Sequence, residues 1–93
     1  MPAIIRVEPS GSGRFRVTVT EGAGKSTHTV SLSPEYYQKL TRNQVSQELF
    51  IERSFQFLLE NEPMESILRE FDLPLIGRYF PEYENEIRRR LAS

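Results

Sequence analysis

The chain has no cysteine and no tryptophan, and it has only one histidine and one aspartate. Without cysteine it can form no disulfide, no thiolate nucleophile and no Cys-ligated zinc or iron–sulfur site. Small secreted domains usually depend on disulfides, so we expect a protein of the reducing cytoplasm. A catalytic triad would need a serine and Asp72 to converge on His28, and no sequence motif brings them together. One histidine is also too few for a His-rich metal cluster. We therefore predict no catalytic residues, no metal and no cofactor, and a protein that is not an enzyme.

Long apolar runs and an excess of one charge are also missing. Ile4 and Ile5 are followed at once by Arg6, which predicts neither a signal peptide nor a membrane-spanning segment. Twelve Lys and Arg residues stand against 13 Asp and Glu residues, so the formal net charge is −1. A dedicated nucleic-acid-binding protein usually has a clear basic excess. The sum hides an asymmetry, because residues 1–47 hold six basic and three acidic groups, whereas residues 48–93 hold six and ten.

The chain does contain enough apolar material to fold. Of its 93 residues 38% are hydrophobic and 11% are aromatic, which is not the composition of a disordered chain. This length supports one hydrophobic core, so we predict a single domain over residues 1–93. Such a small domain is only marginally stable alone, and a protein partner or a second copy would add stability.

Alternating apolar and polar residues predict three strands in the first third of the chain. The alternation is weak over residues 3–8 and clear over residues 14–21 and 27–32. Glycines at 10–13 and at 22–25 mark the intervening turns, because glycine adopts the positive φ that tight turns need.

The same alternation predicts how the last two strands pair. Partners in an antiparallel ladder share a face, which places Val17 opposite Val30 and leaves residues 22–25 as a four-residue loop. One face is then core, with His28 on it, and the other face carries hydroxyl groups and two arginines. The other predicted pairs are Phe15 with Leu32, Val19 with His28, Thr18 with Thr29, and Thr20 with Thr27.

Helical signals fill the rest of the chain. Ser33 before Pro34 is typical of an N-cap followed by proline at the first helical position, and starts a short helix that ends at Leu40 or Thr41. Over residues 45–62 apolar side chains cover most of a longer helix, which marks it as the central buried helix or as a self-association face. Prolines predict three further short helices. These carry Met64, Ile67, Leu68 and Phe71 in the first, residues 75–80 in the second, and Tyr83, Ile87 and Leu91 in the third.

Strands that precede helices indicate an α+β fold. We predict an N-terminal three-stranded antiparallel sheet of hairpins, at about residues 3–32, packed against four to five short C-terminal helices at about residues 34–91.

Two features hint at chemistry but have structural explanations. Residues 24–27, Gly-Lys-Ser-Thr, copy the end of a phosphate-binding P-loop, yet Val19 stands where a further glycine is needed and a strand follows instead of a helix. His28 lies on the predicted core face, where a hydrogen bond to a neighbouring polar group would account for it. An enzyme would require a pocket that brings Asp72 to His28.

The only run of like charge is Arg88, Arg89 and Arg90. Such a run can contact phosphates or an acidic partner, or it can complement the dipole at a helix C-terminus. Glu84 and Glu86 lie four residues before Arg88 and Arg90, in the favourable orientation for ion pairs within a helix. We therefore favour the structural role.

The outer face of the predicted sheet is a candidate surface for nucleic acid. A two-stranded ribbon can enter the major groove, where Arg reads guanine and Thr reaches bases or phosphates. Residues 27–32, followed by Ser33 and two helices, resemble the ribbon-helix-helix arrangement of small repressors and antitoxins. They depart from it because the strand comes third, after a hairpin, and the first helix is short. The candidate nucleic-acid-binding residues are Arg14, Arg16, Thr18 and Thr29.

Four short stretches within the run from Glu52 to Tyr83 carry a second resemblance. They are Ser-Phe-Gln-Phe-Leu-Leu-Glu at 54–60, Ser-Ile-Leu-Arg at 66–69, Phe-Asp-Leu-Pro at 71–74 and Arg-Tyr-Phe-Pro-Glu-Tyr at 78–83. Together they resemble a family of small uncharacterised bacterial proteins with no assigned function. The resemblance covers about a third of the chain and implies a bacterial cytoplasmic protein, with no activity to transfer.

These observations favour a non-enzymatic interaction or regulatory module that binds another protein or a second copy of itself. The helix at 45–62 has more apolar circumference than one sheet face must cover, and three aromatics surround Pro81. We expect Phe80 to be core and Tyr79 or Tyr83 to be partly exposed. A nucleic-acid-binding regulator that uses the Arg/Thr face is the alternative. The candidate partner-binding residues are Phe50, Phe57, Tyr79 and Tyr83.

Overall fold

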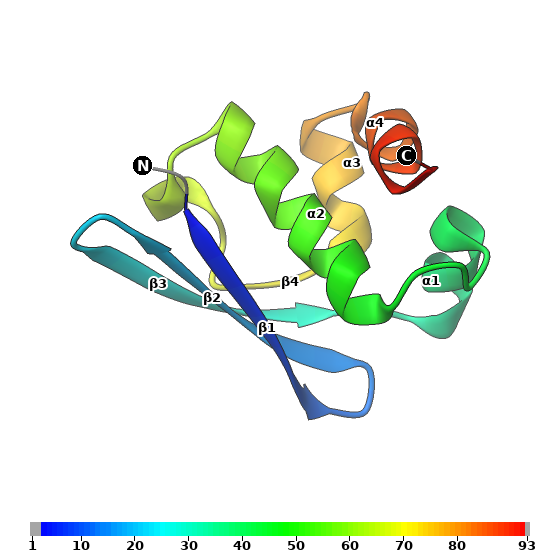
Figure 1. The fold of residues 1–93 in the computed structure, drawn as a ribbon, viewed down its shortest axis with the longest axis horizontal. Helices are drawn as coiled ribbons and strands as arrows, with labels where there is room; N and C mark the ends of the chain where they lie inside the picture. The colour runs from blue at the N-terminus through cyan, green and yellow to red at the C-terminus, as the bar shows by residue number, and fades with distance from the viewer. Residues whose placement is uncertain (1–2, 93) are drawn as a thin grey trace.

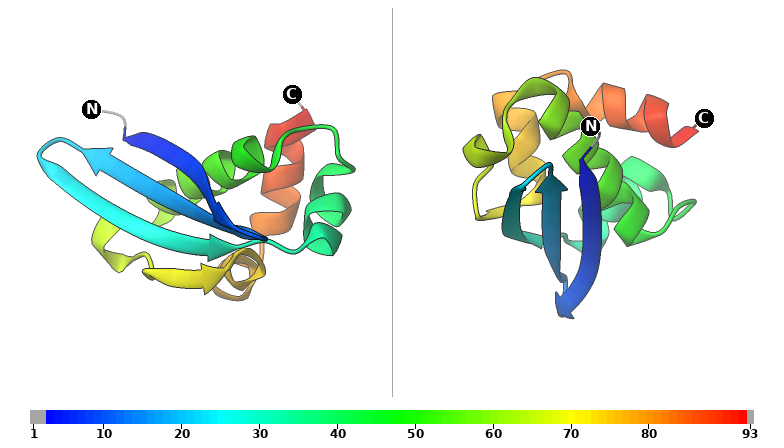
Figure 2. Two further views of the ribbon diagram at one scale, coloured as in Figure 1. Left: turned by 90° about the horizontal axis from the view of Figure 1, so that it is seen from below. Right: turned by 60° about the vertical axis from the view of Figure 1, so that its left-hand side comes forward.

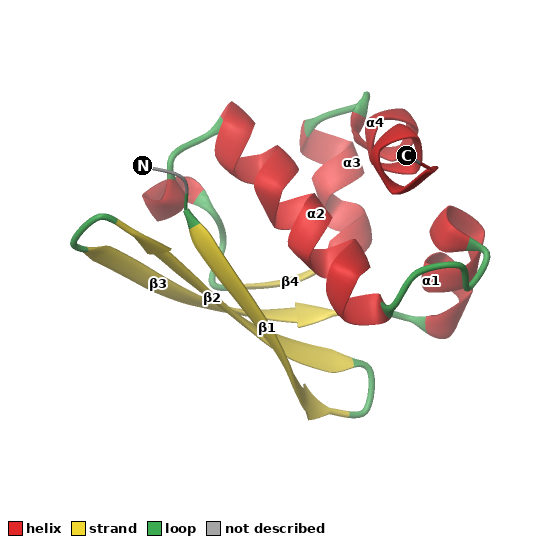
Figure 3. Ribbon diagram, viewed as in Figure 1, coloured by secondary structure: helices red, strands yellow, loops and turns green. Residues whose placement is uncertain are grey.

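A computed structural model describes residues 3–92 as one sheet with helices on one of its faces (Figure 1). Coloured by secondary structure, the two layers separate clearly, which confirms the α+β class (Figure 3). The strands are β1 (Ile4–Gly11), β2 (Arg14–Glu21), β3 (Gly24–Ser31) and β4 (Glu70–Asp72). The helices are α1 (Pro34–Thr41), α2 (Gln47–Asn61), α3 (Ile76–Tyr79) and α4 (Tyr83–Ala92), with 3₁₀ turns at Met64–Ser66 and Leu73–Leu75.

The sheet has the spatial order β1-β2-β3-β4, so β1 and β4 are its two edges (Figure 2). The first three strands pair antiparallel, as predicted, whereas β4 runs parallel to β3. The fourth strand was not predicted, and it turns a three-stranded meander into a mixed sheet.

The pairing of β2 with β3 is shifted by two residues from the predicted register. Val17 lies opposite His28, and the predicted four-residue loop is a two-residue turn at Gly22 and Ala23. Gly22 has a φ of +60°, the conformation that tight hairpin turns require at their first position. A shift of two residues leaves each side chain on its face, so the predicted core face is correct. The observed partners of Phe15, Thr18, Val19 and Thr20 are Val30, Thr27, Ser26 and Lys25, in place of Leu32, Thr29, His28 and Thr27.

The helix predicted after Pro63 is wrong. The chain makes only the 3₁₀ turn Met64–Ser66 and then extends into β4. The Thr29 N–H donates to the Arg69 carbonyl oxygen at 2.7 Å, and Phe71 pairs beside β3. The apolar spacing of this segment suits a helix, but the unpaired edge of β3 offers its backbone a better set of partners.

Serine N-caps start α1 and α2. The cap at Ser33 was predicted, and α2 begins at Gln47, two residues after its predicted start. The Ser33 hydroxyl accepts from the Tyr36 N–H at the start of α1, and the Ser46 hydroxyl accepts from the Leu49 N–H at the start of α2. Helix α2 lies between the sheet and α4 (Figure 1). Of the two roles predicted for this helix, the central buried one is observed. Its fully buried residues are Phe50, Ile51, Ser54 and Phe55.

Helix α4 begins near the predicted place and buries Tyr83 and Ile87 against the rest of the chain. The Tyr83 hydroxyl lies 2.6 Å from the Ser54 hydroxyl of α2. The Ser54 hydroxyl donates its only proton to the Phe50 carbonyl oxygen at 2.8 Å, so Tyr83 is the donor in this pair. Every member of the pair is therefore satisfied in the interior, as buried polar groups must be.

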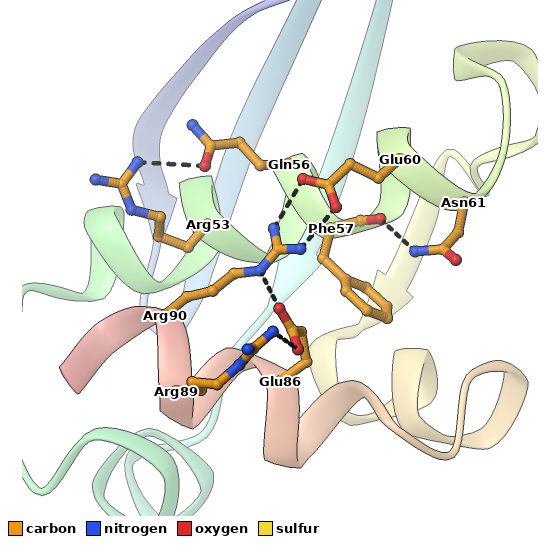
Figure 4. A network of polar contacts seen from close by, with 8 residues as sticks. All are labelled: Arg53, Gln56, Phe57, Glu60, Asn61, Glu86, Arg89 and Arg90. Carbon is orange, nitrogen blue, oxygen red and sulfur yellow. Dashed lines mark hydrogen bonds and ion pairs between the residues drawn. The ribbon is translucent and has the colours of Figure 1, made fainter. Parts of the chain in front are cut away.

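Arg90, at the end of the arginine run, has a structural role (Figure 4). The Arg90 guanidinium donates to both Glu60 carboxylate oxygens, at 3.0 and 2.6 Å, and to Glu86 at 2.9 Å. It lies 5.7 Å from the centre of the Phe57 ring. The predicted Glu86–Arg90 pair is confirmed, and Arg90 also ties α4 to α2.

The other predicted pair in this helix, Glu84 with Arg88, is replaced by contacts across the fold. Glu84 accepts from the Tyr36 hydroxyl at 3.0 Å and lies 3.8 Å from the Lys39 ammonium group. Glu84 therefore joins α4 to α1.

Candidate interaction site

The structure separates the predicted partner-binding residues into two groups. Phe50, Phe57 and Tyr83 are buried within this chain, so a partner could reach them only if elements over them moved. Tyr79 is 66% exposed, which agrees with the expectation that Tyr79 or Tyr83 is partly exposed. Phe80, which we expected to be core, is half-buried and packs against the core. Tyr79 is thus the predicted partner-binding residue that faces solvent.

Tyr79 borders a mostly apolar groove of about 210 Å³. The groove lies between the end of α2, the segment that leads into β4, and the short helix α3. Its lining residues are Leu58, Glu62, Ser66, Ile67, Leu68, Phe71, Leu75, Ile76, Tyr79 and Phe80. A concave apolar surface with a few polar groups is typical of a binding site.

The rim of this groove holds an unusual share of the exposed apolar surface. Within residues 3–92, three large apolar side chains are exposed, namely Ile4, Leu68 and Tyr79. Leu68 is 48% exposed, and both Leu68 and Tyr79 line the groove. Ile4 lies on β1, at the other edge of the sheet. Exposed apolar side chains that gather at one concave place indicate an interaction site more strongly than scattered ones do.

Packed aromatic rings hold the walls of the groove. Phe71 of β4 lies 6.0 Å from Phe55 of α2, measured between ring centres, and Phe80 meets Phe57 edge-on at 5.7 Å. Because Phe55 and Phe57 are core residues of the central helix, the groove is fixed to a rigid element. A preformed surface loses little entropy when it binds.

The buried side chain of His28 contacts the backbone of Leu68 at the rim of the groove. Its Nδ1 donates to the Leu68 carbonyl oxygen at 2.8 Å, and its Nε2 lies 2.8 Å from the Ser26 hydroxyl. Burial lowers the pKa of His28 below its usual 6.5, the Leu68 carbonyl acts in the opposite direction, and the charge of Arg69 lowers it further. The side chain is on the core face, as predicted, and its ring centre lies 5.5 Å from that of Phe55, with the two rings tilted by 53°.

A second, more polar hollow lies beside this histidine. It is lined by Lys25, Ser26, Thr27, His28, Met64, Glu65, Ile67 and Arg69. The Ser26 hydroxyl and the imidazole make the hydrogen-bonded contact that a nucleophile and its base would need. However, His28 is 2% exposed and both ring nitrogens hold structural partners, so its geometry is that of a core residue. Lys25 and Thr27 are strand residues, in keeping with the absence of a P-loop.

The structure does not bring Asp72 to His28. Asp72 pairs beside Ser31, on the outer face of the sheet, whereas His28 faces the helices. The two side chains thus lie on opposite faces, and the pocket that an enzyme would have required here is not formed by them.

The candidate nucleic-acid-binding residues do share one face, the outer face of the sheet. They belong to β2 and β3 and alternate with the buried side chains of these strands, so they point away from the core. They are Arg14, Arg16, Thr18 and Thr29. Glu8 of β1 lies opposite Arg16. The unpredicted strand β4 adds two carboxylates to the same face, because Glu70 and Asp72 pair beside Thr29 and Ser31. The face is therefore mixed in charge.

The resemblance to ribbon-helix-helix proteins does not extend to the position of the strand. Strand β3 lies between β2 and β4, with β2 along one edge and β4 beside Thr29–Ser31 on the other. The end of β3 that leads to the first helix is therefore paired within the chain on both sides, unlike a ribbon strand that pairs with a second chain.

The sequence reasoning missed the role of Leu68, Phe71 and Glu70. It placed Leu68 and Phe71 on the apolar side of a helix that does not form. The available signal was the alternation Glu-Phe-Asp at 70–72, which is too short to predict a strand by itself.

Two further properties concern the described part of the chain. None of the helices within residues 3–92 has the length and apolar character needed to cross a bilayer. In the same range, no three His, Asp or Glu side chains gather where they could hold a metal ion.

Comparisons of the chain with family models, with curated proteins and with solved structures found no match.

Proposed function

We propose that this protein is a non-enzymatic cytoplasmic module that binds another protein through the groove bordered by Leu68 and Tyr79. The observation that carries the proposal is the location of these two side chains. They are two of the three large apolar residues exposed within residues 3–92, and they border the same apolar groove. Aromatic side chains with one exposed face dominate the energetics of protein interfaces.

The alternative, a nucleic-acid-binding regulator, has less support. Arg14 and Arg16 share the outer face of the sheet with Glu8, Glu70 and Asp72. Carboxylates on a surface repel phosphates, and binding to nucleic acid depends on the number of phosphates that a protein neutralises. The mixed face therefore favours a protein partner over a nucleic acid.

A library of linear peptides displayed on phage tests the proposal without knowledge of the natural partner. Peptides are selected on the wild-type protein and then measured against a Leu68→Ser/Tyr79→Ser variant. Both side chains are exposed, so the variant should keep its fold, which circular dichroism would check. Ile4→Ser is the matched control, because it removes a similarly exposed apolar side chain at the other edge of the sheet.

We expect selected peptides to bind the wild type and Ile4→Ser equally and to lose most of their affinity for the double variant. Loss of two apolar anchors should weaken binding by roughly tenfold or more. If selected peptides bind the double variant as well as the wild type, or if selection enriches no peptide, the groove is not the binding site.

A further inference from the structure

We infer that the partner is an extended segment that joins the sheet as a strand beside β4, with basic residues at alternate positions and apolar residues between them. This inference rests on the proposed function, because it names the chemistry of what the groove binds. Addition of a strand to an open sheet edge is a common mode of peptide recognition, in which the backbone supplies affinity and alternate side chains supply specificity.

The backbone of β4 leaves hydrogen-bonding groups open on its outer side. The Arg69 carbonyl oxygen points at β3, where it accepts from the Thr29 N–H at 2.7 Å. Successive residues of a strand point their backbone groups to opposite sides, so the N–H and C=O groups of Glu70 and Asp72 point away from β3. Within residues 3–92 no strand lies on that side. An added strand would find two donors there, the N–H groups of Glu70 and Asp72, and one acceptor, the Glu70 carbonyl oxygen. The Asp72 carbonyl oxygen is already engaged, because Asp72 is the N-cap of the 3₁₀ turn Leu73–Leu75.

The side chains of β4 set the sequence that such a strand needs. Phe71 faces the helices and lines the groove, so the partner residue beside it would enter the groove and should be apolar. Glu70 and Asp72 are exposed on the outer face, and among the described residues neither forms an ion pair. Arg16 and Arg14 of β2 lie in register with Glu70 and Asp72, but β3 lies between them. The backbones of β2 and β4 are therefore two strand spacings apart, roughly 10 Å. Basic partner residues would therefore meet unpaired carboxylates.

The same carboxylates argue against a second copy of this chain at this edge. An antiparallel two-fold pair centred on Phe71 would put Glu70 opposite Asp72 of the other copy. A pair centred on Glu70 or on Asp72 would put that carboxylate opposite itself. Like charges directly opposite in a ladder are destabilising, so each two-fold register is disfavoured.

The other edge of the sheet is a poorer place for strand addition. Strand β1 contains Pro9, which has no N–H to donate, and its pairing is interrupted by a bulge between Pro9 and Gly11. Its outer face carries both Arg6 and Glu8, and the groove is at β4. Strand β4 has only three residues, so the groove and the carboxylates must add to the few backbone bonds.

Synthetic capped hexapeptides test the inference. One alternates lysine with leucine or valine, and a second replaces each lysine with glutamate. Two more versions of the lysine peptide carry N-methyl groups, one on the lysine amides and one on the apolar amides, so that each blocks one edge of the peptide strand. Binding is measured by fluorescence anisotropy to the wild type, to Glu70→Gln/Asp72→Asn, and to the control Glu8→Gln at the other edge.

The lysine peptide should bind roughly tenfold or more tightly than the glutamate peptide. The Glu70→Gln/Asp72→Asn variant should remove most of this difference, and Glu8→Gln should leave it. N-methylation of one of the two sets of amides should abolish binding, and that of the other set should not. Equal binding of both charge types, tolerance of both methylations, or no binding by any hexapeptide would overturn the inference. The proposed function would then still be decided by the peptide library.

Discussion

The Nδ1 atom of His28 donates to the carbonyl oxygen of Leu68 at 2.8 Å, across 40 residues of sequence. A carbonyl oxygen only accepts, so Nδ1 carries the proton and Nε2 of the neutral ring accepts from the Ser26 hydroxyl. This contact ties β3 to the segment that leads into β4. It also holds the backbone of a residue whose side chain forms the rim of the groove, and so couples the core to the proposed site.

The lowered pKa of His28 predicts a stability that depends on pH. Burial, the largest cause, disfavours the charged ring in the folded protein, whereas the unfolded chain binds a proton near the usual pKa of 6.5. The free energy of unfolding should therefore be constant above about pH 7 and fall as the pH drops below about 6.5. Urea unfolding between about pH 5.5 and pH 7.5 measures this.

The variant His28→Asn is the control for this prediction. Its amide can still donate to the Leu68 carbonyl oxygen but does not titrate, so the dependence in this range should disappear. If the free energy of unfolding falls equally in the wild type and the variant as the pH is lowered, another group is responsible.

Ser54 and Tyr83 predict an asymmetric pair of substitutions. Ser54→Ala removes the acceptor of the buried Tyr83 hydroxyl and should cost about 1–3 kcal/mol, because the hydroxyl is left unpaired. Tyr83→Phe removes the donor, while Ser54 keeps its bond to the Phe50 carbonyl oxygen, so the cost should be only about 0.5–1.5 kcal/mol. Thermal unfolding of both variants and of the double variant measures the difference. If Tyr83→Phe costs more than Ser54→Ala, the assigned direction of the hydrogen bond is wrong.

Gly22 tests the register of the second hairpin. Its φ is +60°, and a Cβ added there would meet no atom within 4 Å, so any cost of substitution is conformational. Gly22→Ala should lower the free energy of unfolding by about 1–2 kcal/mol, and Gly22→Asn by less, because Asn tolerates positive φ better than Ala. Chemical denaturation compares the two. Equal stability of Gly22→Ala and the wild type would contradict the tight turn.

Matched substitutions of Arg90 and Arg88 test the structural role of Arg90. Arg90→Lys loses the two-pronged contact with Glu60 and should destabilise the protein by at most about 1 kcal/mol, since the contact faces solvent. The effect should shrink at high salt. Arg88→Lys, at an exposed neighbour without this contact, should change little. Thermal unfolding at low and high salt distinguishes them, and equal effects of both substitutions would argue against the structural role of Arg90.

Local signals were sufficient to predict much of the fold. The alternation around Val17 placed its strand and its buried face correctly, and Ser33 with Pro34 located the start of α1, because both signals act within a few residues. The register of β2 with β3 was wrong because a shift of two residues keeps the same faces, and only the turn conformation at Gly22 decides between the alternatives.

The site depends on contacts that no local pattern reveals. Strand β4 exists because the edge of β3 pairs with it and because His28 and Thr29 hold the preceding carbonyl oxygens. The sequence predicted an exposed aromatic at Tyr79 or Tyr83 but could not show which one packs against Ser54. It also placed Phe50 and Phe57 among the partner-binding candidates. A helix with apolar residues all round has the same sequence pattern whether its own chain or a partner covers it.

The most direct test of the groove is a map of amide chemical shifts as the labelled protein is titrated with a peptide selected from the library. We predict shifts at residues 66–72 and 75–80, with Leu68 and Tyr79 among the largest, and little change at the outer-face residues of β2. Shifts centred on Arg14, Arg16, Thr18 and Thr29, with the groove unchanged, would contradict the account and place binding on the opposite face of the sheet.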